Sequence, residues 1–299
     1  MNQDTSSVAG NLVGARHLIA MFGCQRVGSN YLLALMKGFE NASAYGEMLH
    51  SGGPFPLTGT GGGDDELRLD VVMWILEQRS SKLSEGEKNL LRKWVQDKTY
   101  IEISKYLGSY SRQHPVDIAK YIRNCAPRPI MSFKVFPEHI SEENIPDLIE
   151  EADSVMLLAR NPVETFISYQ KLIRTQMPER HDTSNMKIHF EVNEFLIYLN
   201  ELKGYYSKAL NIARAFDRPV CLINYEHLHQ RETADEKAAY LKETVSATIG
   251  VDLGKFTFDS IPESLHFNKQ DNARLEDRVS NPQDLPAGPS LLDFGAVLN

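Results

Sequence analysis

One segment near the start of the chain, residues 17–47, restricts the fold more than any other. An apolar run from Leu18 to Phe22 is typical of a buried strand, and a loop with glycines at Gly23 and Gly28 follows it. The next residues, NYLLALMKGF, have the apolar spacing of a helix. A strand, a glycine loop and a helix in this order direct backbone N–H groups and a helix N-terminus toward one point. The segment therefore predicts an anion-binding loop within an α/β fold.

The loop has the glycine spacing of a nucleotide P-loop but lacks the lysine that normally follows the second glycine. Ser29 and Asn30 stand at the positions whose Lys and Ser/Thr contact the β/γ-phosphates and magnesium. The positive charge lies inside the loop instead, at Arg26. We therefore expect an anion site that is not built for ATP with magnesium, and we expect no metal ion in it.

Strands and helices are predicted to alternate along the chain. This alternation favours an α/β, P-loop-like fold with a mostly parallel central sheet flanked by helices. The predicted strands are His17–Phe22, Ala42–Tyr45, Ile130–Val135, Val155–Ala159 and Val220–Asn224. The predicted helices are Asn30–Phe39, Asp65–Gln78, Glu85–Gln96, Val116–Cys125, Val163–Thr175, Glu191–Ala215 and Ala234–Ile249. Ser84 with Glu87, and Asn161 with Glu164, have the spacing of a capping box.

We interpret residues 1–299 as a single domain. Residues 51–64 are rich in glycine and proline and are interpreted either as a mobile gate or as a plain surface loop. Residues 65–125 form a predicted helical insertion that would shape a substrate pocket. Residues 280–299 are predicted to be an irregular tail.

Charge and composition narrow the setting of the protein. A net charge of −8 argues against a nucleic-acid partner. No apolar stretch is long enough to cross a bilayer and the N-terminus lacks a basic and apolar leader, so we expect a cytoplasmic protein with no integral membrane segment. The three cysteines lack zinc or redox spacing, which fits a reducing compartment. The sequence leaves open whether the chain forms a homodimer.

Four stretches resemble one enzyme family. Residues 22–31, FGCQRVGSNY, resemble the 5′-phosphosulfate loop of sulfotransferases that use 3′-phosphoadenosine 5′-phosphosulfate (PAPS). Residues 155–162, VMLLARNP, with the helix after them, resemble the 3′-phosphate motif of that family. Residues 132–136, SFKVF, are similar to the lysine-bearing strand of the bacterial branch that acts on carbohydrates and glycolipids. Residues 269–281 resemble sulfotransferase tails, so the likeness runs in the family's order over roughly residues 16–282.

This resemblance implies that PAPS is the co-substrate and that the chain needs no metal. It implies that the residues holding PAPS are Gln25, Arg26, Val27, Gly28, Ser29, Asn30, Arg160, Ser168 and Lys269. Arg26 would balance charge on the leaving phosphate, while Arg160 and Ser168 would meet the 3′-phosphate. Lys134 lies in an apolar strand, where a lysine is costly unless it meets an anion, and the resemblance implies contact with the sulfonate or the acceptor.

Sulfuryl transfer also requires a base behind the acceptor hydroxyl. In the bacterial branch a glutamate just after the second strand takes the proton, and Glu47 lies at the matching place. Partial burial would raise the pKa of Glu47 toward the working range. His50 is the alternative base, because other sulfotransferases use histidine and its ordinary pKa suits neutral pH.

The expected activity is transfer of a sulfuryl group to a hydroxyl of a carbohydrate, a glycolipid or another small molecule. Two other functions remain open. A P-loop kinase with an unusual loop is disfavoured because the lysine after Gly28 and a clear Walker-B aspartate are missing. A non-catalytic nucleotide-binding module is disfavoured because Arg26, Glu47, Lys134 and Arg160 are all retained. The sequence does not identify the acceptor.

Overall fold

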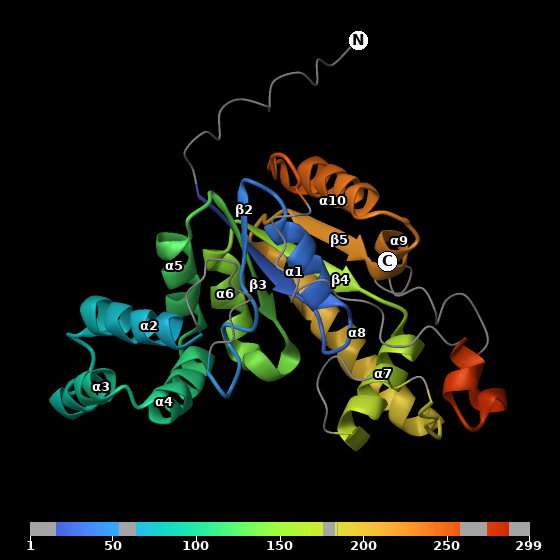
Figure 1. Cartoon of the computed structure of the whole chain (residues 1–299), viewed down its shortest axis with the longest axis horizontal. Coiled ribbons are helices and arrows are strands. Elements are labelled where there is room, and N and C mark those ends of the chain that lie inside the picture. Colours follow the sequence, from blue (N-terminus) through green and yellow to red (C-terminus); the bar gives the residue numbers. More distant parts are fainter. Residues whose placement is uncertain (1–15, 54–63, 176–182, 184, 258–273, 287–299) are drawn as a thin grey trace, which may run out of the picture.

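A computed structural model describes residues 16–53, 64–175, 183, 185–257 and 274–286 of the chain. Its centre is a five-stranded sheet in the order β2-β3-β1-β4-β5, and every neighbouring pair is parallel. Helices flank this sheet, as Figure 1 shows. The predicted α/β class is therefore confirmed, and the sheet is fully parallel over these strands.

The strands lie where the apolar runs predicted them. Their bounds are β1 His17–Phe22, β2 Ala42–Ala44, β3 Ile130–Val135, β4 Ser154–Ala159 and β5 Val220–Asn224. Every residue of β3 and β4 is buried, because helices cover both faces of a parallel sheet. Since all five strands run in one direction, the loops that follow them share one edge of the sheet, and the loops that precede them share the other.

Two layers of helices enclose the sheet (Figure 1). On one side α1 (Ser29–Lys37) packs beside β2, α10 (Ala234–Ile249) packs beside β5, and the two helices touch each other. On the other side α6 (Ile145–Glu151) joins α5 to α8 (Val192–Ala215), while α7 (Pro162–Thr175) follows β4 and packs on α8. The short helix α9 (Tyr225–His229) follows β5 directly.

Four helices lie between β2 and β3 and pack on one another. They are α2 Asp64–Arg79, α3 Glu85–Asp97, α4 Tyr100–Gln113 and α5 Pro115–Cys125. Ser84 and Glu87 form the predicted capping box at the start of α3. Helix α4 was not predicted, because its serines and Gly108 have low helix propensity. Burial of its apolar side, including Ile103, stabilises the helix in the fold.

Other differences from the predicted elements have local causes. Helix α1 ends at Lys37 rather than at Phe39, because the N–H of Gly38 already closes the last turn on Leu35. Helices α6 and α9 were also missed, since both are shorter than the window in which helical periodicity is visible. The other helix boundaries differ from the predicted ones by no more than a residue or so.

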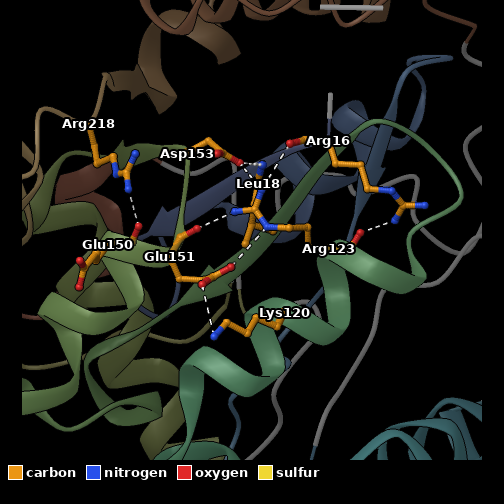
Figure 2. Close-up of polar contacts among 8 residues, drawn as sticks. All are labelled: Arg16, Leu18, Lys120, Arg123, Glu150, Glu151, Asp153 and Arg218. Atoms are coloured by element: carbon orange, nitrogen blue, oxygen red, sulfur yellow. Dashed lines mark hydrogen bonds and ion pairs between the residues drawn. The ribbon is translucent and has the colours of Figure 1, made fainter. Parts of the chain in front are cut away.

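An ion cluster holds the amino edge of the sheet together (Figure 2). Asp153 accepts hydrogen bonds from the N–H of Leu18 and from Nη1 of Arg123, both at 2.7 Å. Arg123 also donates to the carbonyl of Glu151 at 2.6 Å, and it accepts from Arg16 through its own carbonyl. The cluster therefore connects α5 with the segments that enter β1 and β4.

The described part of the chain has no helix long and apolar enough to cross a membrane. Within the same residues, no three side chains among His, Cys, Asp and Glu are grouped so as to hold a metal ion. Residues 54–63 of the proposed gate, Lys269 and residues 287–299 of the predicted tail lie outside the described residues.

Candidate functional site

The glycine loop after β1 has the backbone geometry of an anion-binding turn. Gly28 precedes α1 in the left-handed region at φ 92°, and the ring of Tyr225 lies so close that a Cβ at this position would be 2.3 Å from it. Arg26 is also left-handed, at φ 68°, which is uncommon for a residue with a side chain. Such a conformation costs free energy and is found more often at functional sites than elsewhere.

The loop leads into an α1 N-terminus with no side-chain cap and no acidic residue in its first turn. Backbone N–H groups of a first turn have no partner within the helix, and they carry the positive end of its dipole. An anion placed before Ser29 and Asn30 would satisfy both requirements. The side chain of Val27 is buried in the core, so only its backbone is able to contact a ligand.

Two stretches that are distant in sequence meet at Arg26. Its Nε donates to the hydroxyl of Ser168 in α7 at 3.0 Å, and its carbonyl accepts from Nη1 of Arg160 at 2.8 Å. The loop after β1 and the segment after β4 are therefore joined at the carboxyl edge of the sheet. Ser168 was predicted to act with Arg160, and the structure places it directly against Arg26.

The guanidinium of Arg160 is buried and held on several sides. Its Nη2 donates to Glu164 at 2.8 Å, and the ring of Tyr225 stacks on it with 4.6 Å between the guanidinium carbon and the ring centre. Its Nε–H is buried without a hydrogen-bond acceptor among the described residues. Arg278 approaches the same carboxylate of Glu164, with 3.7 Å between Nη1 and Oε2. One carboxylate is thus shared by two buried arginines, which favours a further anion nearby.

The start of α7 shows only half of its predicted capping box. The Asn161 side chain accepts from the N–H groups of Val163 and Glu164. The carboxylate that should return to the N–H of Asn161 is replaced by Glu226 of α9, which accepts from that N–H at 2.7 Å. Glu164 is instead engaged by Arg160, so the predicted box is wrong in its second half.

Lys134 near the carboxyl end of β3 is the most buried charge of the site. Its side chain is 2% exposed. Its Nζ donates to the side-chain oxygen of Asn30 in the first turn of α1, and it lies 3.4 Å from Oε1 of Glu47. A buried ammonium requires such partners, because desolvation of an unpaired charge is costly. The predicted residues Asn30, Glu47 and Lys134 are therefore brought together by the fold.

Glu47 lies just past β2, between Lys134 and His139. Its Oε2 is 3.6 Å from Nε2 of His139, and its side chain is 28% exposed. Burial raises the pKa of this carboxyl, but contact with His139 and the charges of Lys134, His139 and His50 outweigh burial and lower the pKa to about 2. The expectation that burial would leave the pKa of Glu47 raised is therefore wrong, since cations surround the carboxylate.

His50 is turned away from the role of a base in this arrangement. Its Nδ1 accepts a hydrogen bond from the N–H of Gly52 at 2.9 Å, which leaves the proton of a neutral ring on Nε2. Burial is the main cause that lowers the pKa of His50 below its ordinary value, so the ring is neutral at pH 7. It packs edge-on against His139 with 5.7 Å between ring centres.

Several residues of this site were missed from the sequence. They are His139, Glu164, Tyr225 and Arg278. His139, Glu164 and Tyr225 follow β3, β4 and β5, so the rule that ligands of parallel sheets bind at the carboxyl edge could have found them. Gln25, which was predicted to contact the co-substrate, donates to Glu138 at 2.6 Å.

Comparison with known proteins gives little beyond this geometry. No protein-family model matches the chain, and no curated protein matches it. Among solved structures, the chain is similar to the sulfotransferase domain from the Synechococcus PCC 7002 olefin synthase, with a TM-score of 0.38 and 16% sequence identity. The similarity covers 93% of this chain and 87% of that one. The function is therefore argued from the residues of this chain.

Proposed function

We propose that the protein is a PAPS-dependent sulfotransferase that transfers a sulfuryl group to a hydroxyl of a small acceptor. The observation that carries the proposal is the buried Lys134, which connects Asn30 of the anion loop to the carboxylate of Glu47. A fixed cation between a phosphate-binding helix start and a carboxylate is what transfer of an anionic group to a hydroxyl requires.

The co-substrate is placed by two groups of residues. Its 5′ end lies at Arg26, Gly28 and the first turn of α1, and its 3′-phosphate lies by Arg160 and Ser168. The direct contact between Arg26 and Ser168 supports this arrangement, because two phosphates on one ribose must be bound by residues that are close together. The buried Nε–H of Arg160 offers a donor for the second phosphate.

The reaction proceeds by in-line displacement. The acceptor oxygen forms a bond to sulfur while the bond from sulfur to the 5′-phosphate oxygen breaks, and adenosine 3′,5′-bisphosphate leaves. Arg26 and Lys134 offset the charge that grows on the leaving oxygen. Glu47 takes the acceptor proton, and the anionic donor beside Lys134 raises the pKa of Glu47 from its low value by like-charge repulsion.

His50 stays the alternative base, but its acceptor nitrogen is occupied by Gly52. A carbohydrate or glycolipid acceptor and a cytoplasmic location are part of the proposal. A kinase is disfavoured by Ser29, which stands where a P-loop lysine would be.

A thermal-shift panel tests the proposal. Adenosine 3′,5′-bisphosphate should raise the melting temperature without any metal, because the site binds two phosphates through N–H groups and arginines. ATP or GTP with magnesium should give a smaller shift. Arg160→Ala should reduce the shift from the bisphosphate, whereas Lys93→Gln on the exposed side of α3 should leave it unchanged. Stabilisation by ATP with magnesium and none by the bisphosphate would instead favour the kinase.

A further inference from the structure

A second cavity lies beside the proposed site, between Ser51 and one side of α4. Its volume is about 410 Å³, within the range of small-molecule pockets. The residues that line it are Ser51, Lys105, Gly108, Ser109, Arg112 and Gln113. Those on α4 recur at intervals of three and four residues, so they form one continuous side of the helix.

The cavity is connected to Glu47 through a short turn. The N–H of His50 donates to the carbonyl of Glu47 at 3.2 Å, and the N–H of Gly53 donates to the carbonyl of His50 at 3.0 Å. Ser51 then lies directly on α4, where a Cβ on Gly108 would be 1.9 Å from its carbonyl oxygen. The segment that carries Glu47 thus forms one wall of the cavity.

The cavity is positively charged. Lys105 and Arg112 are exposed and lie two turns apart, which separates their backbones by about 10 Å. Neither forms an ion pair with another described residue, and the nearest carboxylate on α4 is that of Glu102, one turn before Lys105. The charge of Arg112 extends to the neighbouring site, since it contributes to the lowered pKa of His50. Ser109 and Gln113 add uncharged hydrogen-bonding groups.

We propose that this cavity binds an anionic group of the acceptor, a carboxylate or a phosphate, through Lys105 and Arg112. The inference rests on the proposed sulfotransferase activity and names the class of its acceptor. An acceptor held by its charge at α4 directs its hydroxyl toward Glu47 along the turn that begins at that residue. The side chains of Lys105 and Arg112 then select acceptors by charge and are positioned too far along α4 to take part in the chemistry.

The test compares acceptor pairs that differ in charge. The pairs are glycerol phosphate with glycerol, glucose phosphate with glucose, and lactate with lactamide, each assayed with radiolabelled PAPS. The charged member should be sulfated with a kcat/KM at least tenfold higher than its neutral partner. Lys105→Gln and Arg112→Gln should each raise KM for the charged member about tenfold and leave the neutral member unchanged. Lys93→Gln is the matched control and should change neither.

Binding provides a second measurement that does not depend on turnover. Titration calorimetry of the same compounds into protein saturated with adenosine 3′,5′-bisphosphate should show the charged members binding, and both α4 variants weakening them. Equal use of charged and neutral members, or no effect of the α4 variants on binding, would overturn the inference and leave the proposed function intact. Loss of bisphosphate binding by the unaltered protein would refute the proposed function itself.

Discussion

Arg26 donates its Nε–H to the hydroxyl of Ser168 across 3.0 Å, and this contact joins the loop after β1 to the helix after β4. The left-handed backbone of Arg26 is thereby held by a partner from a distant part of the chain. A residue held in this way is able to keep its charge at a fixed place while a leaving group departs, which costs no reorganisation during the reaction.

Removal of this charge should affect the rate more than binding. Arg26→Ala should lower kcat about a hundredfold, because the charge on the leaving phosphate develops only as the bond to sulfur breaks. Affinity for adenosine 3′,5′-bisphosphate, measured by calorimetry, should fall less. Arg26→Lys should recover part of the rate, and Ser168→Ala, which removes only the neutral partner, should cost less than tenfold. A kcat that Arg26→Ala leaves unchanged would exclude this role.

Arg160 should act mainly in binding. Arg160→Ala removes charge-assisted contacts that are the same in the ground and transition states, so affinity for the bisphosphate should fall about tenfold to a hundredfold. The variant should also be less stable, because Glu164 loses the partner at 2.8 Å and keeps only Arg278 at 3.7 Å. Arg160→Lys should restore part of both properties. Calorimetry, with circular dichroism as the folding control, measures the two effects, and undiminished affinity in a folded Arg160→Ala variant would contradict the assignment.

The base assignment is tested by a pair of variants. Glu47→Gln should lower kcat by about two to four orders of magnitude and leave nucleotide affinity within about threefold. His50→Ala should keep most of the rate, since the Nδ1 of His50 is already bound to Gly52. Rates under saturating PAPS decide between them. An active Glu47→Gln protein together with an inactive His50→Ala protein would move the base to His50.

Glu47 should also give the protein a pH-dependent stability. Its pKa in the folded protein is lowered to about 2, below its ordinary value of 4.5. The carboxylate therefore stabilises the fold above pH 4.5, and this contribution, up to about 3 kcal/mol, is lost as pH falls from 4.5 toward 2. Urea unfolding of the parent protein and of Glu47→Gln should show a gap in free energy that is largest near pH 6 and shrinks on acidification. A gap that stays constant between pH 6 and pH 3 would show that the pKa is not lowered.

Two helical glycines offer a matched pair for the wall of the second cavity. Gly108→Ala would place a Cβ 1.9 Å from the carbonyl oxygen of Ser51, so it should destabilise the protein by about 1–3 kcal/mol and displace that wall. Gly204→Ala in α8 meets nothing within 4 Å and should stabilise by about 0.5–1 kcal/mol, because alanine favours a helix more than glycine does. Urea unfolding measures both, and equal effects of the two substitutions would rule out the contact between Ser51 and α4.

Much of the fold was predictable because its signals are local. The buried runs at His17–Phe22 and Ile130–Val135 became strands with the predicted bounds, and Ala234–Ile249 became a helix with the predicted bounds. Helix α4 was not predictable in this way, since packing against other helices stabilises it despite Gly108 and its serines. Tertiary contacts of this kind leave no periodic trace in a sequence.

The candidate site divides along the same line. Asn30, Glu47 and Lys134 were each named from the sequence, and the fold brings them together. The lowered pKa of Glu47 was not predicted, because it depends on His139, whose approach to Glu47 requires the three-dimensional path of the chain after β3. Sequence spacing identifies candidate groups, while their protonation depends on neighbours that spacing does not show.

The ion cluster around Arg123 and Asp153 has a practical consequence for the use of this protein. It lies at the amino edge of the sheet, and six-residue strands such as β1 and β4 separate it from the carboxyl edge by about 20 Å. A surface attachment made beside this cluster would therefore leave the opposite edge facing the medium. Immobilised in that orientation, the protein would present Arg26, Lys134 and Glu47 to dissolved reactants.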